Sequence, residues 1–434
     1  MSNESGQTKY VVFDPKAFIH GPYRKCPSCN AESAFGVLLI GPYHYVRRCR
    51  ECWHDASFTL PRLKKSVLYL DQFAISNMMK ALHPAVDREI DVFWLELFRR
   101  VDRLCKLQLL VCPESELHTE EALVAPFAPE LKRMYELLSG GVTLHGGAHV
   151  QRVQIFEHVR RWARGGEREP WKFDLDAVTN GDLGGWQERL RISVQWTNVD
   201  ERVAEIRKSR AVVDREIVPV FERWQAEKGD FWTWFGQEAR SYRTVLDLYL
   251  DYYRRLEKIR NGTLQPDFRQ ILPPLAVMTI RTIREALRKA GVEESEIWPK
   301  VMEYLLSDAL ETLPFNRISA LLTAAVARKV AAGQKRPPTR GMLNDIRFLS
   351  TYLPYCDAML VDNECHGLSV EQPLRDELAP YDCRIFCMNT KDDLMAYLGD
   401  IEAKASPEHL ATVREVYGES WEKPYETMYG SEGP

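Results

Sequence analysis

The sequence predicts an α/β fold with a parallel sheet, a large helical insertion and an N-terminal zinc-ribbon module. Three observations lead to this prediction. Two cysteine pairs lie near the N-terminus, two distant apolar runs each end in an aspartate, and long amphipathic patterns fill the region between those runs. An acid directly after a buried strand is typical of the carboxyl edge of a parallel sheet, where α/β folds bind ligands.

Composition and charge narrow the class of protein. The chain has 434 residues, of which 45% are hydrophobic and 28% charged, and its formal net charge is -4. This length allows two or three domains. The net charge excludes a generic polycation, so nucleic-acid contact has to come from a local basic patch. No signal peptide and no membrane-spanning apolar run is visible, and we expect a cytoplasmic protein.

Residues 1–62 are predicted to form the zinc ribbon. Two CxxC pairs are separated by about 19 residues, and apolar segments at 35–40 and 43–46 resemble hairpin strands between them. Four thiolates satisfy tetrahedral zinc and leave no open position, so the zinc is expected to be structural. The predicted ligands are Cys26, Cys29, Cys49 and Cys52. The basic and aromatic residues around them fit either a phosphate-backbone contact or a solvated face.

Residues 63–125 are predicted to form the first half of the α/β domain. A buried strand at 67–70 ends at Asp71, a helix spans 85–106, and a second strand spans 107–112. A further helix opens at residues 113–118. Glu116 follows the second strand, and we predict that it faces Asp71. The alternative is that Glu116 is an ordinary acidic residue at a helix start.

Residues 126–335 are predicted to be a helical insertion of domain size. The predicted helices span 129–138, 150–164, 199–228, 231–261, 275–290, 295–306 and 316–331. Basic and aromatic residues are mixed at 160–164 and 252–255, as is usual for solvated helix faces; the alternative is nucleic-acid contact. The insertion is a candidate surface for a protein partner or for homo-oligomer formation.

Residues 336–434 return to the α/β pattern and add a C-terminal helix. A basic loop leads to a helix that starts at Asn344 or Asp345, and an apolar strand at 358–361 ends at Asp362. A last strand at 383–388 precedes a short helix at 391–398. Four cysteines on or beside these strands are interpreted as buried small hydrophobic residues, namely Cys356, Cys365, Cys383 and Cys387.

Five acids are candidates for one site, because each lies at a strand end or helix start. They are Asp71, Glu116, Asp345, Asp357 and Asp362. Carboxylate oxygens are the ligands that Mg²⁺ prefers, and such ions orient and polarise phosphodiesters. The alternative is that each acid is a helix cap or a surface charge. The chain has no P-loop, no dinucleotide glycine motif and no nucleophile elbow, which argues against those classes.

The acid pattern resembles the PIN-domain nucleases. Leu70-Asp71 matches the first acid of that family, Glu116 is similar to the second, Asp345 looks like the third, and Asp362 after Met359-Leu360-Val361 looks like the fourth. Asp357 in Pro354-Tyr355-Cys356-Asp357-Ala358 fits an extra acid of the longer PIN-like branch. The resemblance implies a PIN-like three-layer α/β/α fold and a Mg²⁺- or Mn²⁺-dependent endonuclease.

The resemblance also implies roles for these residues. Asp71 and Asp362 are the expected primary metal ligands, Glu116 and Asp345 complete the site, and Asp357 supports it. Apart from the resemblance, Arg340, Arg347 and Lys391 are candidate phosphate contacts, although an ordinary surface charge is the favoured interpretation of each. The expected substrate is nucleic acid, RNA rather than DNA, and a regulated toxin or defence effector is one form of this prediction. The alternative is a catalytically degenerate PIN-like scaffold that binds RNA or protein through the zinc ribbon.

Overall fold

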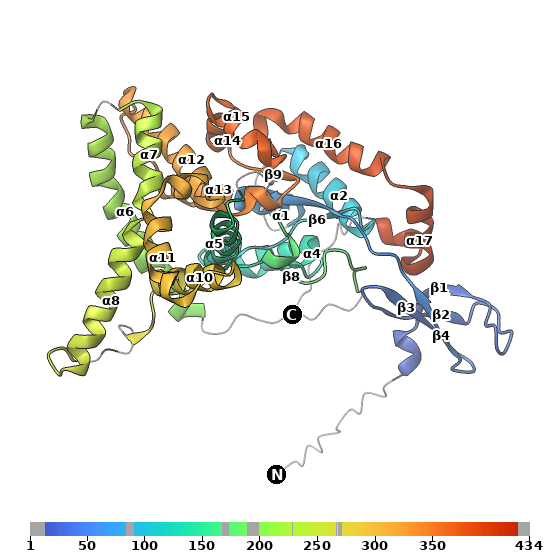
Figure 1. Cartoon of the computed structure of the whole chain (residues 1–434). Helices are drawn as coiled ribbons and strands as arrows, with labels where there is room; N and C mark the ends of the chain where they lie inside the picture. The colour runs from blue at the N-terminus through green and yellow to red at the C-terminus, as the bar shows by residue number, and fades with distance from the viewer. Residues whose placement is uncertain are drawn as a thin grey trace, which may run out of the picture.

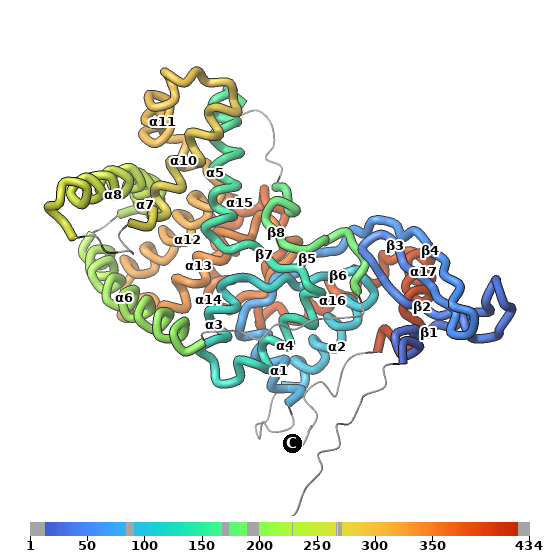
Figure 2. Tube along the Cα trace, turned by 90° about the horizontal axis from the view of Figure 1, so that it is seen from below, coloured from blue at the N-terminus to red at the C-terminus, as the bar shows by residue number. Residues whose placement is uncertain are grey.

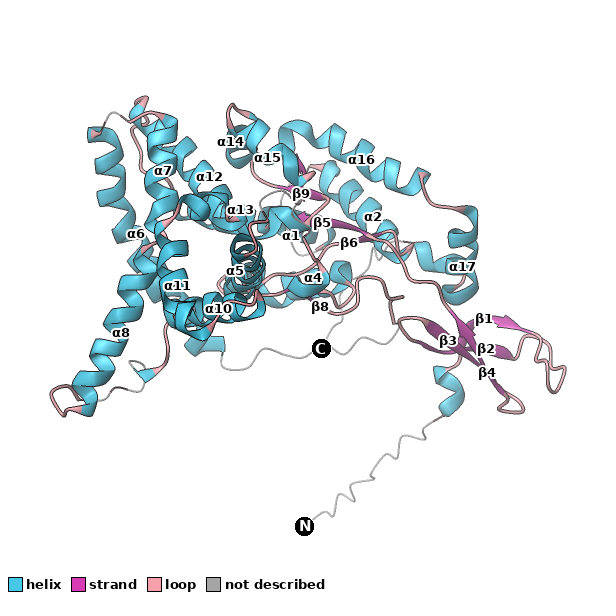
Figure 3. Ribbon diagram, viewed as in Figure 1, coloured by secondary structure: helices cyan, strands magenta, loops and turns pink. Residues whose placement is uncertain are grey.

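The chain combines a small antiparallel sheet with a parallel sheet that helices cover on both faces (Figures 1 and 3). The structure is a computed structural model that describes residues 14–83, 91–166, 173–188, 199–227, 229–265, 267 and 271–423. The antiparallel sheet lies at one end of the molecule and the helices α6 and α8 lie at the other (Figure 1). The predicted mixed α/β class, with one parallel sheet and one separate antiparallel sheet, is confirmed.

The antiparallel sheet contains four strands in the order β1-β2-β3-β4. Their bounds are His20–Arg24, Phe35–Ile40, His44–Cys49 and Asp55–Thr59. β2 and β3 form the hairpin that the sequence predicts, whereas β1 and β4 were not predicted. Fully buried Arg47 links this sheet to helix α17 (Pro407–Tyr417). Its guanidinium donates to the carbonyls of Pro22 and Phe35 in the sheet at 2.8 and 3.2 Å, and to the carbonyl of Glu415 in α17 at 2.7 Å.

The parallel sheet has the order β10-β9-β5-β6. Its strands span Arg384–Phe386, Ala358–Leu360, Ser66–Leu70 and Leu110–Val111. Side chains alternate between the two faces of β5, as a buried central strand requires. Val67 and Tyr69 belong to one hydrophobic core, and Leu68 and Leu70 belong to another. The sheet therefore forms the middle layer of three.

Two sets of helices cover the faces of this sheet. The Val67 face packs against α5 (Gly147–Ala163), α12 (Pro314–Ala331) and α13 (Arg340–Tyr352). The Leu68 face packs against α1 (Gln72–Leu82), α2 (Val92–Lys106), α4 (Ala128–Ser139) and α16 (Lys391–Ala403). Two further helices follow strands at the carboxyl edge, α3 (Glu116–Ala122) after β6 and α14 (Asn363–Val370) after β9.

The predicted insertion is helical apart from a two-stranded sheet, β7 (Thr143–Leu144) and β8 (Thr179–Asn180). Its other helices are α6 (Val199–Ala226), α7 (Phe231–Ser241), α8 (Thr244–Arg260), α10 (Leu275–Lys289) and α11 (Ile297–Leu306). The prediction of one helix over 231–261 was wrong, because the chain turns at Tyr242 and Arg243. Tyr242 packs on Phe315 there, and Arg243 donates to the carbonyl of Leu306 at 2.9 Å.

Two other helix starts differ from expectation. The helix expected at Asn344 or Asp345 begins at Arg340, because the Thr339 hydroxyl caps it by accepting the amide of Met342 at 3.2 Å. The helix expected over 85–106 begins at Val92, because the Asp91 carboxylate caps it by accepting the amide of Phe93 at 2.9 Å; the expected start at residue 85 lies outside the described residues. Along the described chain, every helix is too short or too polar to cross a bilayer.

Candidate functional site

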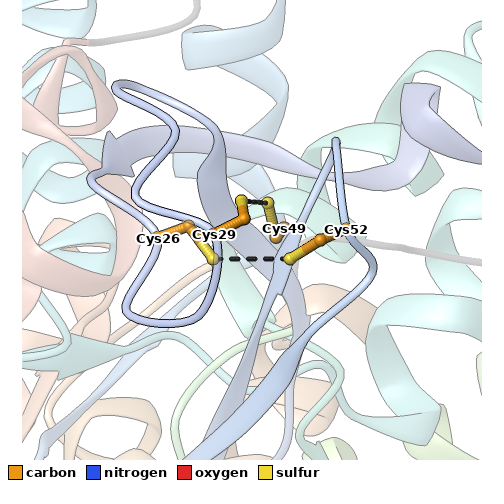
Figure 4. Close-up of side chains that lie close together, drawn as sticks. All are labelled: Cys26, Cys29, Cys49 and Cys52. Atoms are coloured by element: carbon orange, nitrogen blue, oxygen red, sulfur yellow. Dashed lines mark hydrogen bonds between the residues drawn. The ribbon is translucent and has the colours of Figure 1, made fainter.

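The four predicted cysteine ligands come together at the ends of the antiparallel sheet (Figure 4). The Sγ atoms of Cys26 and Cys52 are 3.6 Å apart and those of Cys29 and Cys49 are 3.7 Å apart. Bonds of about 2.3 Å from a tetrahedral zinc ion would place sulfurs about 3.8 Å apart. A disulfide would require about 2.05 Å. The cluster is therefore compatible with structural zinc.

The two CxxC turns have the same local geometry. The amide of Ser28 donates to Cys26 Sγ and the amide of Glu51 donates to Cys49 Sγ, each at 3.4 Å. Each turn closes with a residue of positive φ, Asn30 at 60° and Trp53 at 62°. Amides that point at sulfur stabilise the thiolate form, which is the form that binds metal. The backbone of both turns therefore favours thiolates that can bind a metal cation.

A second cluster lies at the carboxyl edge of the parallel sheet. Leu70 of β5 pairs with Leu360 of β9, so the acids that follow these neighbouring strands, Asp71 and Asp362, reach the same edge. Both acids cap helices: Asp71 accepts the amide of Gln72 and Asp362 accepts the amide of Cys365, each at 2.6 Å. Their positions follow directly from the parallel pairing of two strands that precede helices.

Two further acids reach this edge from helices. Asp345 lies in the second turn of α13 and Glu121 lies near the end of α3, where it accepts a hydrogen bond from the Asn344 side chain at 3.1 Å. All four carboxylates line one cavity of about 580 Å³. Among the described residues, none of the four forms an ion pair with a lysine, arginine or histidine. The cavity therefore gathers four carboxylates that form no direct ion pair among those residues, although Lys80, Arg210 and Arg340 also line it.

The electrostatics of this carboxylate pocket follow from that crowding. Burial raises the pKa of Asp71 to about 7, with a further contribution from the negative charge of Glu121. Burial also raises the pKa of Asp345 to about 8, and the charges of Asp71 and Asp362 add to the shift. Burial raises the pKa of Glu121 as well. Buried like charges favour protonation or a bound cation.

Glu116 is not part of this pocket. Its exposed carboxylate lies against Gly146, where a Cβ atom would collide with it, and it does not line the cavity. Glu116 is the first residue of α3, whereas Glu121 comes five residues later and about 140° around the helix axis. The structure therefore places Glu116 outside the pocket, whereas Glu121 of the same helix lines it. Glu121 continues the stripe of buried Leu117 and His118, which is a signal that the sequence contained.

Asp357 is also outside the pocket. It precedes β9, and its Oδ2 accepts the amide of Val67, in the first half of β5, at 2.7 Å. Parallel strands that start together put Asp357 at the amino edge of the sheet, opposite the edge that holds Asp71 and Asp362. Its expected supporting role in the acid cluster is therefore wrong.

Of the three basic residues predicted as phosphate contacts, two lie at or near the pocket and one lies away from it. Arg340 lines the pocket and pairs with Asp214 at 3.0 Å, and Arg347 is 3.9 Å from Glu120 on the neighbouring surface. Lys391 instead pairs with Asp91 at 3.5 Å and does not line the pocket. Sequence reasoning missed Arg210 of α6, which lines the pocket beside Arg340.

One cysteine adjoins the acids. The sulfur of Cys365 and carboxylate oxygens of Asp345 and Asp362 all lie within 4.8 Å of one another. Burial, reinforced by these two carboxylates, raises the pKa of Cys365, so the group stays a thiol. Cys365 is buried in the core beside Met342. Cys356 and Cys387 are also buried, whereas Cys383 is half-buried. The expectation of small buried residues fits three of the four.

Comparisons with protein-family models, with curated proteins and with solved structures gave no significant match to this chain.

Proposed function

We propose that this chain is a PIN-like, metal-dependent endonuclease that hydrolyses phosphodiester bonds, with RNA as its substrate. One observation carries the proposal: four carboxylates from four separate elements meet in one pocket with no ion-pair partner among the described residues. Asp71 and Asp362 cap helices, but capping does not account for four half-buried acids that repel one another, since such a cluster costs stability. Functional sites commonly contain such groups.

The donor set fits a hard divalent cation. Asp71, Glu121, Asp345 and Asp362 would hold Mg²⁺ or Mn²⁺, because these ions prefer carboxylate oxygens and the four carboxylates line one cavity. When bound, such an ion supplies polarisation of a phosphodiester and a lower pKa for an attacking water. Glu121 replaces Glu116 in the set that the resemblance implied.

The remaining residues of the pocket have roles that the chain itself defines. Asn344 donates to Glu121 and so fixes the orientation of that carboxylate. Lys80, Arg210 and Arg340 line the same cavity and would attract a polyanion toward the acids. Phosphodiester hydrolysis needs both parts, since positioning and charge stabilisation supply most of the rate enhancement in such reactions.

The alternative function, a scaffold that binds RNA or protein through the ribbon, has less support. Three cations of the ribbon are already paired: Arg24 with Glu415, Lys25 with Glu32 and Arg48 with Asp55. These pairs are exposed, so a phosphate could replace the acids. Each replacement breaks an existing ion pair, which lowers the net free energy gained on nucleic-acid binding. Arg50, which lies over the Tyr23 ring, remains as the main feature in favour of this alternative.

The test is a cleavage assay on labelled single-stranded RNA and DNA with Mn²⁺, Mg²⁺ or EDTA. We expect the wild type to cut RNA only with the metal, and we expect Asp71→Asn and Asp362→Asn to lose cleavage at least about 100-fold. Asp357→Asn is the matched control, since it changes an exposed acid at the opposite edge. Cleavage by Asp71→Asn at the wild-type rate, or metal-independent cleavage, would refute the proposal. Binding without cleavage would favour the scaffold.

A further inference from the structure

A second hollow continues from the carboxylate pocket toward the insertion. It has a volume of about 300 Å³, and it shares Glu121, Arg210, Arg340 and Asn344 with the larger cavity of about 580 Å³. Its walls are α3, α13 and the long helix α6, which lie together in the view of Figure 2. We call the two connected hollows the α6 groove. The groove makes the helical insertion part of the surface around the acids.

One face of α6 lines this groove. Arg202, Ile206, Arg210 and Val213 recur at intervals of three or four residues, so their side chains share one side of the helix. Arg202 and Arg210 are eight residues apart, which corresponds to about 12 Å along the axis. Roughly three to four phosphates of a stacked single strand span that length. The cations on α6 therefore have a spacing that suits a polynucleotide backbone.

Arg210 lacks the partner that a partly buried arginine normally has. Among the described residues it forms no ion pair, although it lies beside Glu121 and Arg340. Burial lowers its pKa and the positive charge of Arg340 adds to the effect, while the negative charges of three nearby carboxylates, Glu121 foremost, oppose it. A guanidinium that is partly desolvated and close to another guanidinium is stabilised by a bound anion, and phosphate suits its donor geometry.

The opposite wall contributes two arginines that are paired with exchangeable acids. Arg340 pairs with Asp214 at 3.0 Å, and Arg347 lies 3.9 Å from Glu120. The side chains in both pairs are about a third exposed or more, so a phosphate can replace the carboxylate at low cost. The other acids that line the smaller hollow are Glu121, which belongs to the carboxylate pocket, and Glu205, which has its own partner.

We propose that the α6 groove binds the backbone of a single-stranded polynucleotide, with Arg210 holding a phosphate next to the carboxylate pocket and Arg202 holding one further along the strand. This inference rests on the proposed nuclease function. A single strand is favoured because the acids lie half-buried at the bottom of a pocket that α6 walls. A duplex carries its phosphates on a stiff convex surface and would have to deform to reach them.

Binding is measured in full-length protein with Asp71→Asn/Asp362→Asn, so that cleavage does not consume the probe. The probes are fluorescent single-stranded RNA and its duplex, followed by anisotropy over a range of salt concentrations. Arg202→Ala/Arg210→Ala and the milder Arg210→Gln are compared with Lys208→Ala/Arg215→Ala. These controls are exposed cations on the far side of the same helix.

We expect the groove variant to weaken single-strand binding about tenfold or more and to reduce the slope of log K against log salt by roughly 1.4, which corresponds to two lost phosphate contacts. Arg210→Gln is expected to show a smaller loss, and the control variant none. Unchanged binding by the groove variant, an equal loss in the control, equal affinity for the duplex, or no polynucleotide binding would each overturn the inference.

Cleavage separates this inference from the proposed function. In the otherwise wild-type enzyme, Arg210→Gln should raise KM for RNA more than it lowers kcat, because Arg210 positions the strand and touches no reacting group in this arrangement. Metal-dependent cleavage with no effect of Arg210→Gln on KM refutes the groove alone. Binding that depends on Arg210, in a protein that never cleaves, refutes the proposed function and leaves the groove in place.

Discussion

The cysteine cluster and the carboxylate pocket differ in how the chain builds them. The ribbon takes its four sulfurs from two tight turns within one small sheet, so a short spacing pattern contains nearly all the information. The carboxylate pocket takes its four acids from two strand ends and two helices, and the strands that carry Asp71 and Asp362 are about 290 residues apart. The residues of a local site can therefore be identified from their spacing in the sequence. The residues of a dispersed site also depend on the order of the strands and on which face of each helix points to the site.

The largest effect that tests this comparison is loss of the ribbon's metal. We expect purified protein to contain one zinc per chain and Cys49→Ser to lose it, since Cys49 is a buried member of the cluster. Apparent zinc-binding energies of about 10 kcal/mol or more in comparable small domains imply that the ribbon unfolds without metal. Elemental analysis and hydrogen exchange of the antiparallel sheet measure this. Cys383→Ser, outside the cluster, should keep full zinc content; zinc retained by Cys49→Ser would contradict the assignment.

The second effect tests the helix phase of the dispersed site. Glu121→Gln should reduce RNA cleavage by about 100-fold or more, which corresponds to about 2.7 kcal/mol, because it removes a charge from the pocket. Glu116→Gln alters the same residue type on the same helix but should stay within about twofold of wild type, since that side chain is exposed beside Gly146. Initial rates with Mn²⁺ measure both. The reverse ranking would restore the original assignment of Glu116.

The third effect tests how strongly the attachment of the ribbon to α17, through Arg47, contributes to the stability of the protein. Arg47→Met should lower the free energy of unfolding by about 2–3 kcal/mol, because it removes three hydrogen bonds from a fully buried guanidinium. Arg48→Met breaks only the exposed pair with Asp55 and should cost about 1 kcal/mol or less. Denaturant unfolding measures the difference. Zinc content should stay normal in both variants; a loss of zinc in Arg47→Met would mean that attachment and metal binding are one unit.

The smallest effect is a pH dependence of stability that arises from the carboxylate pocket and that the ribbon should not share. The raised pKa values of Asp71 and Asp345, about 7 and about 8, lie above the unfolded value of about 3.9. The native state therefore binds more protons, and metal-free protein loses stability as pH rises from about 4 to about 8. Asp345→Asn should raise stability at pH 8 by about 1–2 kcal/mol and change it little near pH 4.

Melting curves in a weak Mg²⁺ chelator, and then with added Mn²⁺, measure this effect. Added Mn²⁺ should stabilise wild type more at pH 8 than at pH 5, and should stabilise Asp345→Asn less than wild type. Equal pH profiles for the wild type and Asp345→Asn would show that the acids do not repel one another in solution.

Particular residues show how far sequence reasoning reached. Strand-end acids were found because an apolar run of four or five residues followed by Asp is distinctive, and the fold brings Asp71, Asp345 and Asp362 together. Glu116 and Asp357 were expected in the acid cluster and lie outside it. Glu116 points away from the pocket around the axis of α3, and Asp357 lies at the amino edge of the sheet instead of the carboxyl edge. Arg210 could not be found, because nothing in an amphipathic helix tells which distant surface it will face.

The pairing of β5 with β9 has a consequence for synthesis of the protein. Leu68 pairs with Ala358, so the central strands of the sheet cannot join until the whole insertion has been translated. Domains fold as their chains emerge, and contacts of such high sequence separation form late. During translation, the ribbon and the first two acids are exposed long before Asp345 and Asp362 exist. The carboxylate pocket therefore cannot assemble on a nascent chain until synthesis of that chain is nearly finished.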